Sequence, residues 1–589
     1  MAPELHRIQQ LKKIPMNIVA RQILKWREKY VDTLAKLYEY STTLYEKNRM
    51  SEMLGSDMGY TYGSFRKKCD EISARLSRYG IGAGDRVAIL SQNMPNWTVA
   101  MFSLVPFGRI CVPILPDSSP TEVSNILKHS ECKAVFVSQR LLPKISQECT
   151  EMMVLVIDIE TFEIIKRDDS AYTCNGRVIS PLPDDLATII YTSGTTGSAK
   201  GVMLSHRNLI TNVKISYHAH RCTEKDRWLS ILPMPHTYEM SIGVLYPIFV
   251  GACVYYIQKP PTPSVLLPAI KAVKPTVMLS VPLVIEKIYK NSVVPTIAHS
   301  RILGWMKEKM PKILYWFIGM KLKTTFGGRL KFFGIGGAKL DSTVETFLKM
   351  AKFPYAIGYG MTECAPLICT ANPKQTKVGS TGGAAWNVTV RLSDVNSSGE
   401  GEIQVKGDNV MLGYYKDPER TRSMFTDDGW LRTNDLASRD EKGRYYIKGR
   451  LNNMIIGPSG ENIYPEEIEK VINDMDEVNE SIVMERDGRL VALVQFNDNI
   501  IDWDQEGEDK FFEKLEARKQ AVLNYVNKHV SKSSKVNSVE VVKEPFEKTA
   551  TMKIRRFKYR KGDRTKDTSG EKPEQGSAPA GKADAAKSE

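Results

Sequence analysis

Residues 191–206 read YTSGTTGSAKGVMLSH, and this stretch decides the fold. It follows ATII at residues 187–190, which predicts a buried strand. A strand that leads into a loop rich in glycine and hydroxyl side chains is suited to hold phosphate, because backbone N–H groups and short O–H donors can both approach the oxygens. The loop is not a Walker A motif, since Ala199 occupies the place where that motif continues with Gly-Lys-Ser/Thr after Gly194. The alternative interpretation is a flexible turn.

The size and charge of the chain limit its class. Its 589 residues exceed the usual core of one domain, which predicts a large domain with at least one smaller one. The net charge of +14 favours anionic partners. The sequence has no nucleic-acid motif, so we expect phosphate ligands and a membrane surface, and no nucleic acid. The 9 cysteines are scattered without a C-x-x-C pair, which favours ordinary thiols in a reducing cytoplasm over a disulfide or zinc framework.

Alternating strand and helix patterns indicate an α/β fold. They run from about residue 60 to 137 and resume in EMMVLVID, ATIIYTSG and KPTVMLSVP, which favours parallel sheets flanked by helices. We expect a basic helical segment at 1–50, a large N-terminal domain at 51–450, a small α+β domain at 451–560 and a tail at 561–589. The tail lacks every large apolar residue and is expected to be disordered.

Three segments bear on contact with membranes. Arg7, Lys12 and Lys13 interrupt any apolar stretch at the N-terminus, so we expect no signal peptide. Residues 240–258 are long enough to span a bilayer, but their glycines and proline favour a helix, a turn and a buried strand. Residues 301–323 predict a basic amphipathic helix, kinked at Pro311, which lies on an anionic membrane or packs on the large domain.

Five further motifs follow the loop in a fixed order. Each is weak alone: PMPHTYE (233–239), GIGGAKL (334–340), GYGMTE (358–363), WLRTND (430–435) and KIRR (553–556). Together with the 191–201 loop, their order and spacing resemble the ANL superfamily of adenylate-forming enzymes, from about residue 60 to 557. The resemblance implies a large adenylate-forming N-terminal domain, for ATP and acyl binding, and a small mobile C-terminal α+β domain that acts as a lid.

The resemblance implies an ATP site with three parts. The β- and γ-phosphates would lie in the loop, adenine against a glycine turn and a tyrosine, and the ribose on an acid. These residues are Thr192, Ser193, Gly194, Thr195, Thr196, Gly197 and Lys200 for the phosphates, Gly336, Gly337, Ala338, Tyr359 and Gly360 for adenine, and Asp435 with Arg450 for the ribose. Backbone of the glycine turn would approach one side of the base, and Tyr359 would stack on the other.

The resemblance also implies the catalytic groups. Thr362 would bond the α-phosphate, Glu363 would bind Mg²⁺, and Lys553 would bridge the carboxylate and the α-phosphate. His236 is the fourth candidate catalytic residue. In the superfamily the small domain rotates after adenylation, so the loop Ser459, Gly460, Glu461 and Asn462 is expected to form the thiol channel, with the hinge at Asn452.

Three positions depart from the superfamily pattern. Asn434 replaces the glycine of WxRTGD, and a non-glycine residue fits if φ stays negative or if, as asparagine does, it tolerates the left-handed region. Asn452 stands where the hinge residue is usually Asp or Lys, and residues 379–387 read GSTGGAAWN in place of a GxPxP-like stretch. None of these departures removes a side chain that adenylation needs for binding ATP or the acid.

Within the superfamily, GDNVMLGYY (407–415), VPLVIEKIY (281–289) and residues 449–469 resemble long-chain fatty acid–CoA ligases, which are AMP-forming acid–thiol ligases. We expect a fatty acid, ATP and CoA as substrates, an acyl tunnel lined partly from residues 230–340, and a cytoplasmic enzyme with peripheral membrane contact. Two alternatives stay open. The first is an adenylating ligase that uses an aryl or other acid, or that transfers the acyl group to acyl carrier protein instead of CoA. The second is a non-enzymatic sensor of a nucleotide or a lipid.

Overall fold

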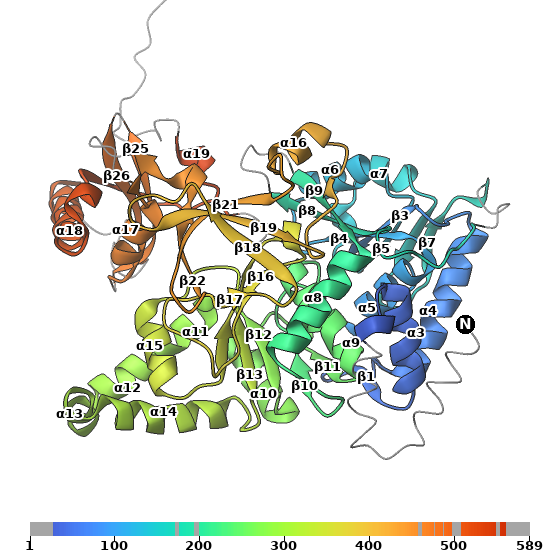
Figure 1. Cartoon of the computed structure of the whole chain (residues 1–589), viewed down its shortest axis with the longest axis horizontal. Coiled ribbons are helices and arrows are strands. Elements are labelled where there is room, and N and C mark those ends of the chain that lie inside the picture. The colour runs from blue at the N-terminus through green and yellow to red at the C-terminus, as the bar shows by residue number, and fades with distance from the viewer. Residues whose placement is uncertain are drawn as a thin grey trace, which may run out of the picture.

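The predicted α/β fold is confirmed, with two large sheets in the N-terminal part of the chain (Figure 1). The structure is a computed structural model, and it describes residues 28–170, 176–193, 199–456, 462–475, 477–486, 488–497, 508–548 and 554–560. The first sheet contains β3 (Arg86–Leu90), β4 (Ile110–Ile114), β5 (Ala134–Val137), β6 (Leu155–Asp158), β7 (Ile164–Arg167), β8 (Leu186–Ser193), β9 (Ala199–Ser205) and β20 (Gly413–Tyr414). They lie in the order β20–β9–β8–β4–β3–β5–β6–β7.

The second sheet is parallel apart from its last strand pair. It contains β1 (Arg49–Met53), β2 (Gly59–Thr61), β10 (Arg227–Leu229), β11 (Cys253–Tyr256), β12 (Val277–Ser280), β13 (Phe332–Ile335) and β14 (Tyr355–Ile357). They lie in the order β14–β13–β12–β10–β11–β1–β2. In the first sheet the central strands β4, β3, β5 and β6 are also parallel, as the alternating sequence pattern predicted.

Helix α8 (His206–Ala219) lies between the two sheets (Figure 1). Its apolar residues belong to one core that also includes strand residues of both sheets, such as Val87 and Trp228. The other helices of this core are α3 (Leu34–Leu44), α4 (Tyr62–Arg78), α5 (Pro95–Phe102) and α9 (Tyr246–Val250). Most residues of α8 are buried, and the partly exposed Arg207, Lys214 and His218 share one narrow face, so this helix joins the sheets instead of covering one of them.

Further helices cover the outer faces of the sheets. On the first sheet these are α6 (Pro120–Ser130) and α7 (Gln147–Glu151). On the second sheet they are α10 (Pro263–Val273), α11 (Pro282–Ile288), α12 (Val294–Ala298), α13 (Arg301–Lys309), α14 (Pro311–Thr325) and α15 (Ser342–Met350). A short helix, α16 (Pro418–Ser423), follows β20.

Small antiparallel sheets follow along the chain. One contains β15 (Tyr359–Gly360), β16 (Leu367–Thr370) and β17 (Gly383–Ala384), and another contains β18 (Val388–Ser393), β19 (Glu400–Gly407), β21 (Leu431–Arg439) and β22 (Tyr445–Arg450). Beyond residue 450, β23 (Ile455–Ile456) pairs with β24 (Asn462–Ile463). The short helix Leu451–Asn453 between β22 and β23 includes the predicted hinge position, Asn452.

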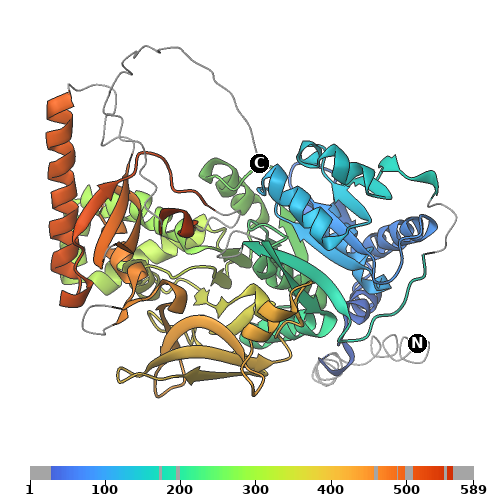
Figure 2. The same ribbon diagram turned by 90° about the horizontal axis from the view of Figure 1, so that it is seen from above.

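The C-terminal part of the chain has a core of its own (Figure 2). Helices α17 (Pro465–Asn473) and α18 (Glu508–His529) pack there on a sheet of β25 (Val478–Arg486), β26 (Arg489–Phe496) and β27 (Ser538–Val541), and α19 (Phe557–Arg560) follows. Ion pairs join this part to two helices of the N-terminal part: Arg555 Nη2 lies 2.7 Å from Glu122 Oε1 of α6, and Lys470 Nζ lies 3.3 Å from Oδ2 of Asp341, the N-cap of α15. The predicted domain boundaries stay a prediction.

Local expectations from the sequence agree with these elements. Residues 239–256 form a π-helix (Glu239–Leu245), α9, a turn at Gly251 with φ of +78°, and β11, as expected for a helix, a turn and a buried strand. In the described part of the chain no helix is both long and apolar enough to cross a bilayer. The tail and most of segment 1–50 lie outside the described residues. The eight cysteines that the structure describes are buried free thiols.

A buried carboxyl group opens the π-helix. Glu239 is 1% exposed, and the Ser230 hydroxyl donates a hydrogen bond of 2.6 Å to its Oε1, while Oε2 has no hydrogen-bond partner among the residues that the structure describes. Burial raises the pKa of Glu239 from 4.5 to about 8. The folded protein therefore holds a proton on this group at neutral pH, whereas the unfolded chain does not.

Glu239→Gln is expected to remove a pH dependence of stability. A raised pKa means that folding takes up a proton between pH 4.5 and 8, so the free energy of unfolding falls as pH rises through that window, by about 1.4 kcal/mol per pH unit. The glutamine variant should match the parent near pH 5 and exceed it increasingly towards pH 8. Denaturant unfolding at several pH values measures this. If the free energy of unfolding had the same pH dependence in the variant and the parent, the prediction would be contradicted.

Candidate active site

Asp435 stands at the centre of the first cluster of predicted site residues. It is 7% exposed, and Tyr359 donates a hydrogen bond of 2.6 Å from its hydroxyl to Asp435 Oδ2. Arg450 Nε lies 3.2 Å from Asp435 Oδ1, because the two residues are direct partners on the antiparallel strands β21 and β22. Burial and the neighbouring carboxylate raise the pKa of Tyr359 well above its ordinary value, so its hydroxyl stays protonated. The predicted ribose and adenine residues thus meet in the fold.

The backbone at Asn434 takes the left-handed conformation that glycine would favour. Its φ is +58°, and its backbone N–H donates 3.1 Å to Glu402 Oε1. The next N–H, of Asp435, donates 3.1 Å to Thr433 Oγ1. Asparagine therefore fills this position by adopting positive φ, which it tolerates better than most residues.

The second cluster places a lysine on a buried carboxylate. Lys200 Nζ lies 3.2 Å from Glu363 Oε1, and Glu363 is 5% exposed. The Tyr414 hydroxyl donates 2.7 Å to the same Oε1 and accepts a 3.0 Å hydrogen bond from Lys200 Nζ. Burial and Glu363 raise the pKa of Tyr414. Tyr414 lies in the GDNVMLGYY stretch but is not among the predicted site residues.

Two asparagines of α8 hold the segments that carry these clusters. The buried Asn212 donates 2.9 Å from Nδ2 to the Cys364 carbonyl and accepts 2.8 Å at Oδ1 from the Leu367 N–H. One turn earlier, Asn208 Nδ2 donates to the carbonyls of Asp408 and Val410 at 2.9 and 2.7 Å. The segments around Glu363 and before Tyr414 are therefore fixed to one helix. No motif of the sequence analysis includes these asparagines.

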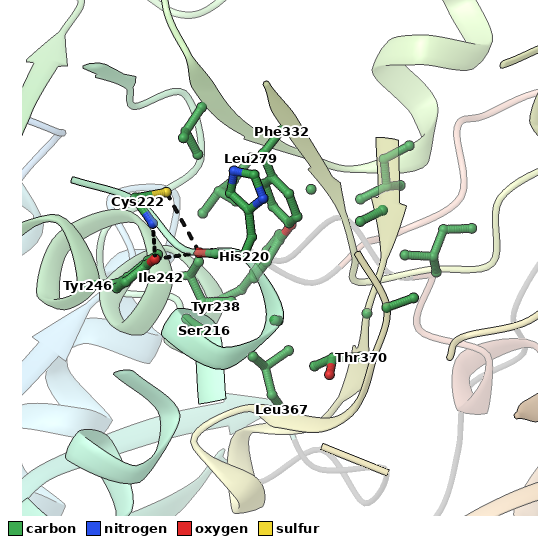
Figure 3. Close-up of a pocket in the computed structure, with 18 residues that line it drawn as sticks. Ser216, His220, Cys222, Tyr238, Ile242, Tyr246, Leu279, Phe332, Leu367 and Thr370 are labelled. Carbon is green, nitrogen blue, oxygen red and sulfur yellow. Dashed lines mark hydrogen bonds between the residues drawn. The ribbon is translucent and has the colours of Figure 1, made fainter. Parts of the chain in front are cut away.

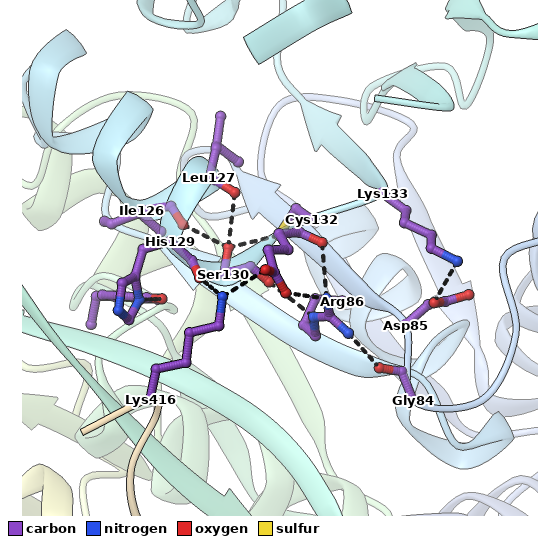
Figure 4. Close-up of polar contacts among 12 residues, drawn as sticks. Gly84, Asp85, Arg86, Ile126, Leu127, His129, Ser130, Cys132, Lys133 and Lys416 are labelled. Atoms are coloured by element: carbon purple, nitrogen blue, oxygen red, sulfur yellow. Dashed lines mark hydrogen bonds and ion pairs between the residues drawn. The ribbon is translucent and has the colours of Figure 1, made fainter. Parts of the chain in front are cut away.

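A third anchor fixes the chain just after Tyr414 (Figure 4). Lys416 Nζ lies 2.7 Å from Glu131 Oε1 and donates 3.3 Å to the His129 carbonyl, at the C-terminal end of α6. A cation is favourable at a helix C-terminus, where carbonyl groups lack partners. Arg86 Nη2 lies 3.0 Å from Glu131 Oε2. The edge strand β20, which carries Tyr414, is thus anchored both before its first residue and after its last.

Hydroxyl groups lie next to the predicted phosphate contacts. Thr362 Oγ1 and Thr237 Oγ1 are 3.4 Å apart, and Thr237 follows the candidate His236 directly. His236 is partly buried, and its Nδ1 accepts a hydrogen bond of 3.2 Å from the Tyr238 N–H. The fold therefore brings the PMPHTYE motif to the Thr362 turn.

The glycine turn after β13 faces a tyrosine. A Cβ atom on Gly336 would lie 3.3 Å from the Tyr238 ring, whereas on Gly337, with φ of +89°, such an atom would lie 3.8 Å from its nearest neighbour in the described part of the chain, Val281. A Cβ atom on Gly360 would lie only 2.0 Å from the Pro366 carbonyl oxygen. The backbone contact excludes a Cβ atom at Gly360, whereas at Gly336 the tyrosine ring would have to move by only a few tenths of an ångström. That Gly336, Gly337 and Ala338 approach a base stays a prediction.

An apolar cavity lies beside the glycine turn, with an empty volume of about 510 Å³ that includes its open mouth (Figure 3). Strands β12, β13 and β14, helix α8 and the π-helix contribute its walls. His220 stacks on Phe332 at one wall, with ring centroids 4.7 Å apart, and burial lowers the pKa of this histidine. Among the described residues that line the cavity, none is Asp, Glu, Lys or Arg.

Several predicted site residues lie outside the described part of the chain. These are Gly194, Thr195, Thr196 and Gly197 of the phosphate loop, Ser459, Gly460 and Glu461 of the thiol-channel loop, and Lys553. Thr192 lies in β8 directly before the phosphate loop, with Ser193 as its last residue, and Asn462 opens β24. Their predicted roles stay predictions.

Asn434→Val is expected to destabilise the protein, since a β-branched residue at φ of +58° costs about 1–2 kcal/mol more than one that tolerates this conformation. Asn434→Gly is the matched control and should stay within about 0.5 kcal/mol of the parent, because glycine adopts this conformation readily. Denaturant unfolding measures both. Equal stability of the valine and glycine variants would contradict the strained conformation.

Comparisons with known proteins agree with this arrangement. The family model described as AMP-binding enzyme matches residues 43–415. Peroxisomal long chain acyl-CoA synthetase 6 of Arabidopsis thaliana is 28% identical over 79% of this chain and 72% of its own. Long-chain-fatty-acid–CoA ligase 1 of Homo sapiens is 27% identical over 75% of this chain and 71% of its own.

Solved structures share the fold. o-Succinylbenzoate CoA synthetase from Bacillus subtilis, in complex with its acyl-adenylate intermediate, superposes with a TM-score of 0.71 at 21% identity, over 89% of this chain and 98% of its own. ATP-bound MatB from Rhodopseudomonas palustris gives a TM-score of 0.70 at 24% identity, with the same coverage. Because the family model covers more than half of the sequence, the chain belongs to the AMP-binding enzymes of the adenylate-forming ANL superfamily.

Proposed function

We propose that this adenylate-forming enzyme is a long-chain fatty acid–CoA ligase. A carboxylate oxygen of the acid attacks the α-phosphorus of ATP, and pyrophosphate leaves with the electron pair of the broken P–O bond. The CoA sulfur then attacks the acyl-AMP carbonyl, AMP leaves, and the thiol proton passes to solvent. The first step brings two anions together, so cations and N–H donors must spread the charge.

The single observation that carries the choice of acid is the apolar cavity beside Tyr238. An amino acid or a dicarboxylic acid would bring a second charge into this space, and the described lining offers no side chain of formal charge to pair with it. A hydrocarbon chain needs no such partner. The printed names of the relatives from Arabidopsis thaliana and Homo sapiens support the same substrate class.

Glu363 suits the Mg²⁺ ion of the proposed reaction. Among the described residues, no group of three or more His, Cys, Asp and Glu side chains gathers to hold a metal. Mg²⁺ is usually bound through one or two carboxylates plus substrate phosphates, so the single buried carboxylate fits it. The ion would neutralise phosphate charge there. Lys200 and the Tyr414 hydroxyl fix the carboxylate that would hold it.

The C-terminal part from residue 451 is proposed to act as a lid that carries Lys553. The chain directly after this residue contacts both parts of the molecule. Arg556 forms two hydrogen bonds with the buried Glu469 of α17, and Arg555 pairs with Glu122 of α6. The same part would offer residues 459–462 to the thiol in the second step, after rotation at Asn452.

A second candidate is a ligase for an aryl or other acid. An anthranilate CoA ligase shares the fold with a TM-score of 0.69 at 19% identity, and the aromatic pair His220–Phe332 lines the cavity. Acyl carrier protein is the alternative acceptor to CoA. The protein is proposed to work in the cytoplasm and to contact an anionic membrane, into which long-chain acids partition.

Pyrophosphate release over a panel of acids tests the proposed substrate. We expect release with C12–C18 fatty acids. Amino and dicarboxylic acids should give little release because they would bring a second charge into the cavity, and aryl acids should give less because a ring buries less apolar surface there than a long chain. The assay is run without acceptor, with CoA and with acyl carrier protein, and thiol consumption is followed separately. Release with aryl or short acids but not with C12–C18 acids would overturn the proposal.

Lys553→Ala is expected to abolish acyl-AMP formation, with a loss of about 3–4 kcal/mol or more of transition-state stabilisation. CoA transfer from supplied acyl-AMP should be spared, because the lysine acts only in the first step. Single-turnover measurements of the two half-reactions separate these effects. Lys558→Ala is a matched control, since Lys558 lies five residues later in the same part of the chain and pairs with Glu547. Normal adenylation by Lys553→Ala would refute the assignment.

A further inference from the structure

Helix α14 has two apolar faces, and only one of them is covered. Leu314, Tyr315 and Leu322 are buried in the core beneath the second sheet. On the same face Gly319 lies against α15, where a Cβ atom would come within 2.1 Å of the Ala351 carbonyl oxygen. This close approach fixes the rotation of the helix, so the opposite face cannot turn inward.

The opposite face is an unbroken apolar stripe. Ile313, Trp316, Phe317 and Met320 follow the i, i+3, i+4, i+7 spacing of one helical face and are 47%, 40%, 51% and 40% exposed. On α13, Ile302 and Trp305 are 72% and 55% exposed. The sequence predicted one kinked helix here. The structure instead has two helices that meet at Met310–Pro311, with Leu314 inward and Trp316 outward.

The charge that surrounds the stripe is almost wholly positive. Residues 301–325 contain six basic residues and one acid, Glu308. Lys307, Lys309, Lys312 and Lys321 are exposed, and no ion pair within the described residues neutralises them. An open groove, whose empty space of about 1110 Å³ includes solvent outside it, continues the stripe towards the end of α15, where Lys349 and Lys352 add two more cations beside Trp316 and Phe317.

We propose that residues 301–325, the α13–α14 surface, dock on an anionic lipid bilayer. Exposed single apolar residues are ordinary, but a continuous stripe indicates a binding surface. Tryptophan and phenylalanine beside lysines suit the interface of a membrane with acidic lipids, where the rings enter the headgroup region and the ammonium groups meet phosphate. Figure 1 shows α13 and α14 at the margin of the molecule, with no other element below them.

A second copy of the chain fits this surface less well. A symmetric contact through α13 and α14 would bring the six basic residues of one copy against the six of the other, with a single acid on each side. Like charges at close range oppose such a contact. An anionic bilayer instead supplies the missing counter-charge. The surface is separate from the apolar cavity and the ATP residues, so this inference does not rest on the proposed ligase reaction.

Flotation of the full chain with vesicles tests the proposal without ATP or substrate. Vesicles of phosphatidylcholine alone are compared with vesicles that contain one-third phosphatidylglycerol, at low and at high salt. We expect binding to the anionic vesicles to exceed binding to the neutral ones by about tenfold or more and to weaken by a similar factor at high salt.

Variants separate the apolar and the cationic contributions. The double change Trp316→Ser with Phe317→Ser should lower binding about tenfold or more, since both rings leave the interface. Leu182→Ser with Val395→Ser is the matched control, because these residues are 68% and 54% exposed elsewhere on the chain. The triple change of Lys307, Lys312 and Lys321 to Gln tests the cationic contribution and should also lower binding. Its control is the same triple change at Lys67, Lys374 and Lys442, which are also exposed. Neither control should alter binding.

Fluorescence gives a readout that a purely structural role would not change. Brominated lipids quench only tryptophans that enter the bilayer, so quenching should fall in Trp305→Phe with Trp316→Phe, while the thermal transition is unchanged. Three results would each overturn the proposal. The first is binding that does not depend on lipid charge or salt, and the second is equal binding by the Trp316→Ser/Phe317→Ser variant. The third is a concentration-dependent dimer through this surface without lipid binding.

Discussion

The burial of α8 between two sheets is the constraint on which the candidate site depends. Asn208 and Asn212 lie on the buried side of this helix, away from water, so both must find hydrogen-bond partners in the protein. They find them in the backbone of two loops that are far away in sequence, around residues 364–367 and 408–410. The requirement for hydrogen bonds in a buried helix thereby fixes the loops that carry Glu363 and Tyr414.

The polar groups of the site are organised around two buried carboxylates. Asp435 receives Tyr359 and Arg450, and Glu363 receives Lys200 and Tyr414. A buried carboxylate is costly unless it is paired and hydrogen-bonded, and each of these has a cation and a phenol within hydrogen-bonding or ion-pair distance. In the proposed reaction, each pair would exchange a protein partner for a nucleotide or a metal ion, with the donors already in place.

The molecule presents apolar surface in two separate places with different surroundings. The cavity beside Tyr238 lies between strands and helices and opens to solvent at its mouth, and no side chain of formal charge is among its described lining residues, which suits a hydrocarbon chain that leaves water. The α13–α14 surface is open and bordered by lysines, which suits an interface where apolar and anionic groups lie together. Helix α14 thus contributes one face to the protein core and its opposite face to solvent.

The sequence by itself determined the superfamily and the α/β class, because phosphate chemistry requires glycines, hydroxyls and charges in short local motifs. It predicted residues that the fold brings together, Tyr359 with Asp435 and Lys200 with Glu363. It also indicated that residues 240–258 form a helix, a turn and a strand. It did not reveal Tyr414, Asn208 or Asn212, since their partners lie far along the chain, nor that α14 has a covered and an open face. Periodicity shows that a helical face is apolar, but only tertiary packing decides which face is covered, because close contacts such as Gly319 on Ala351 form between distant elements.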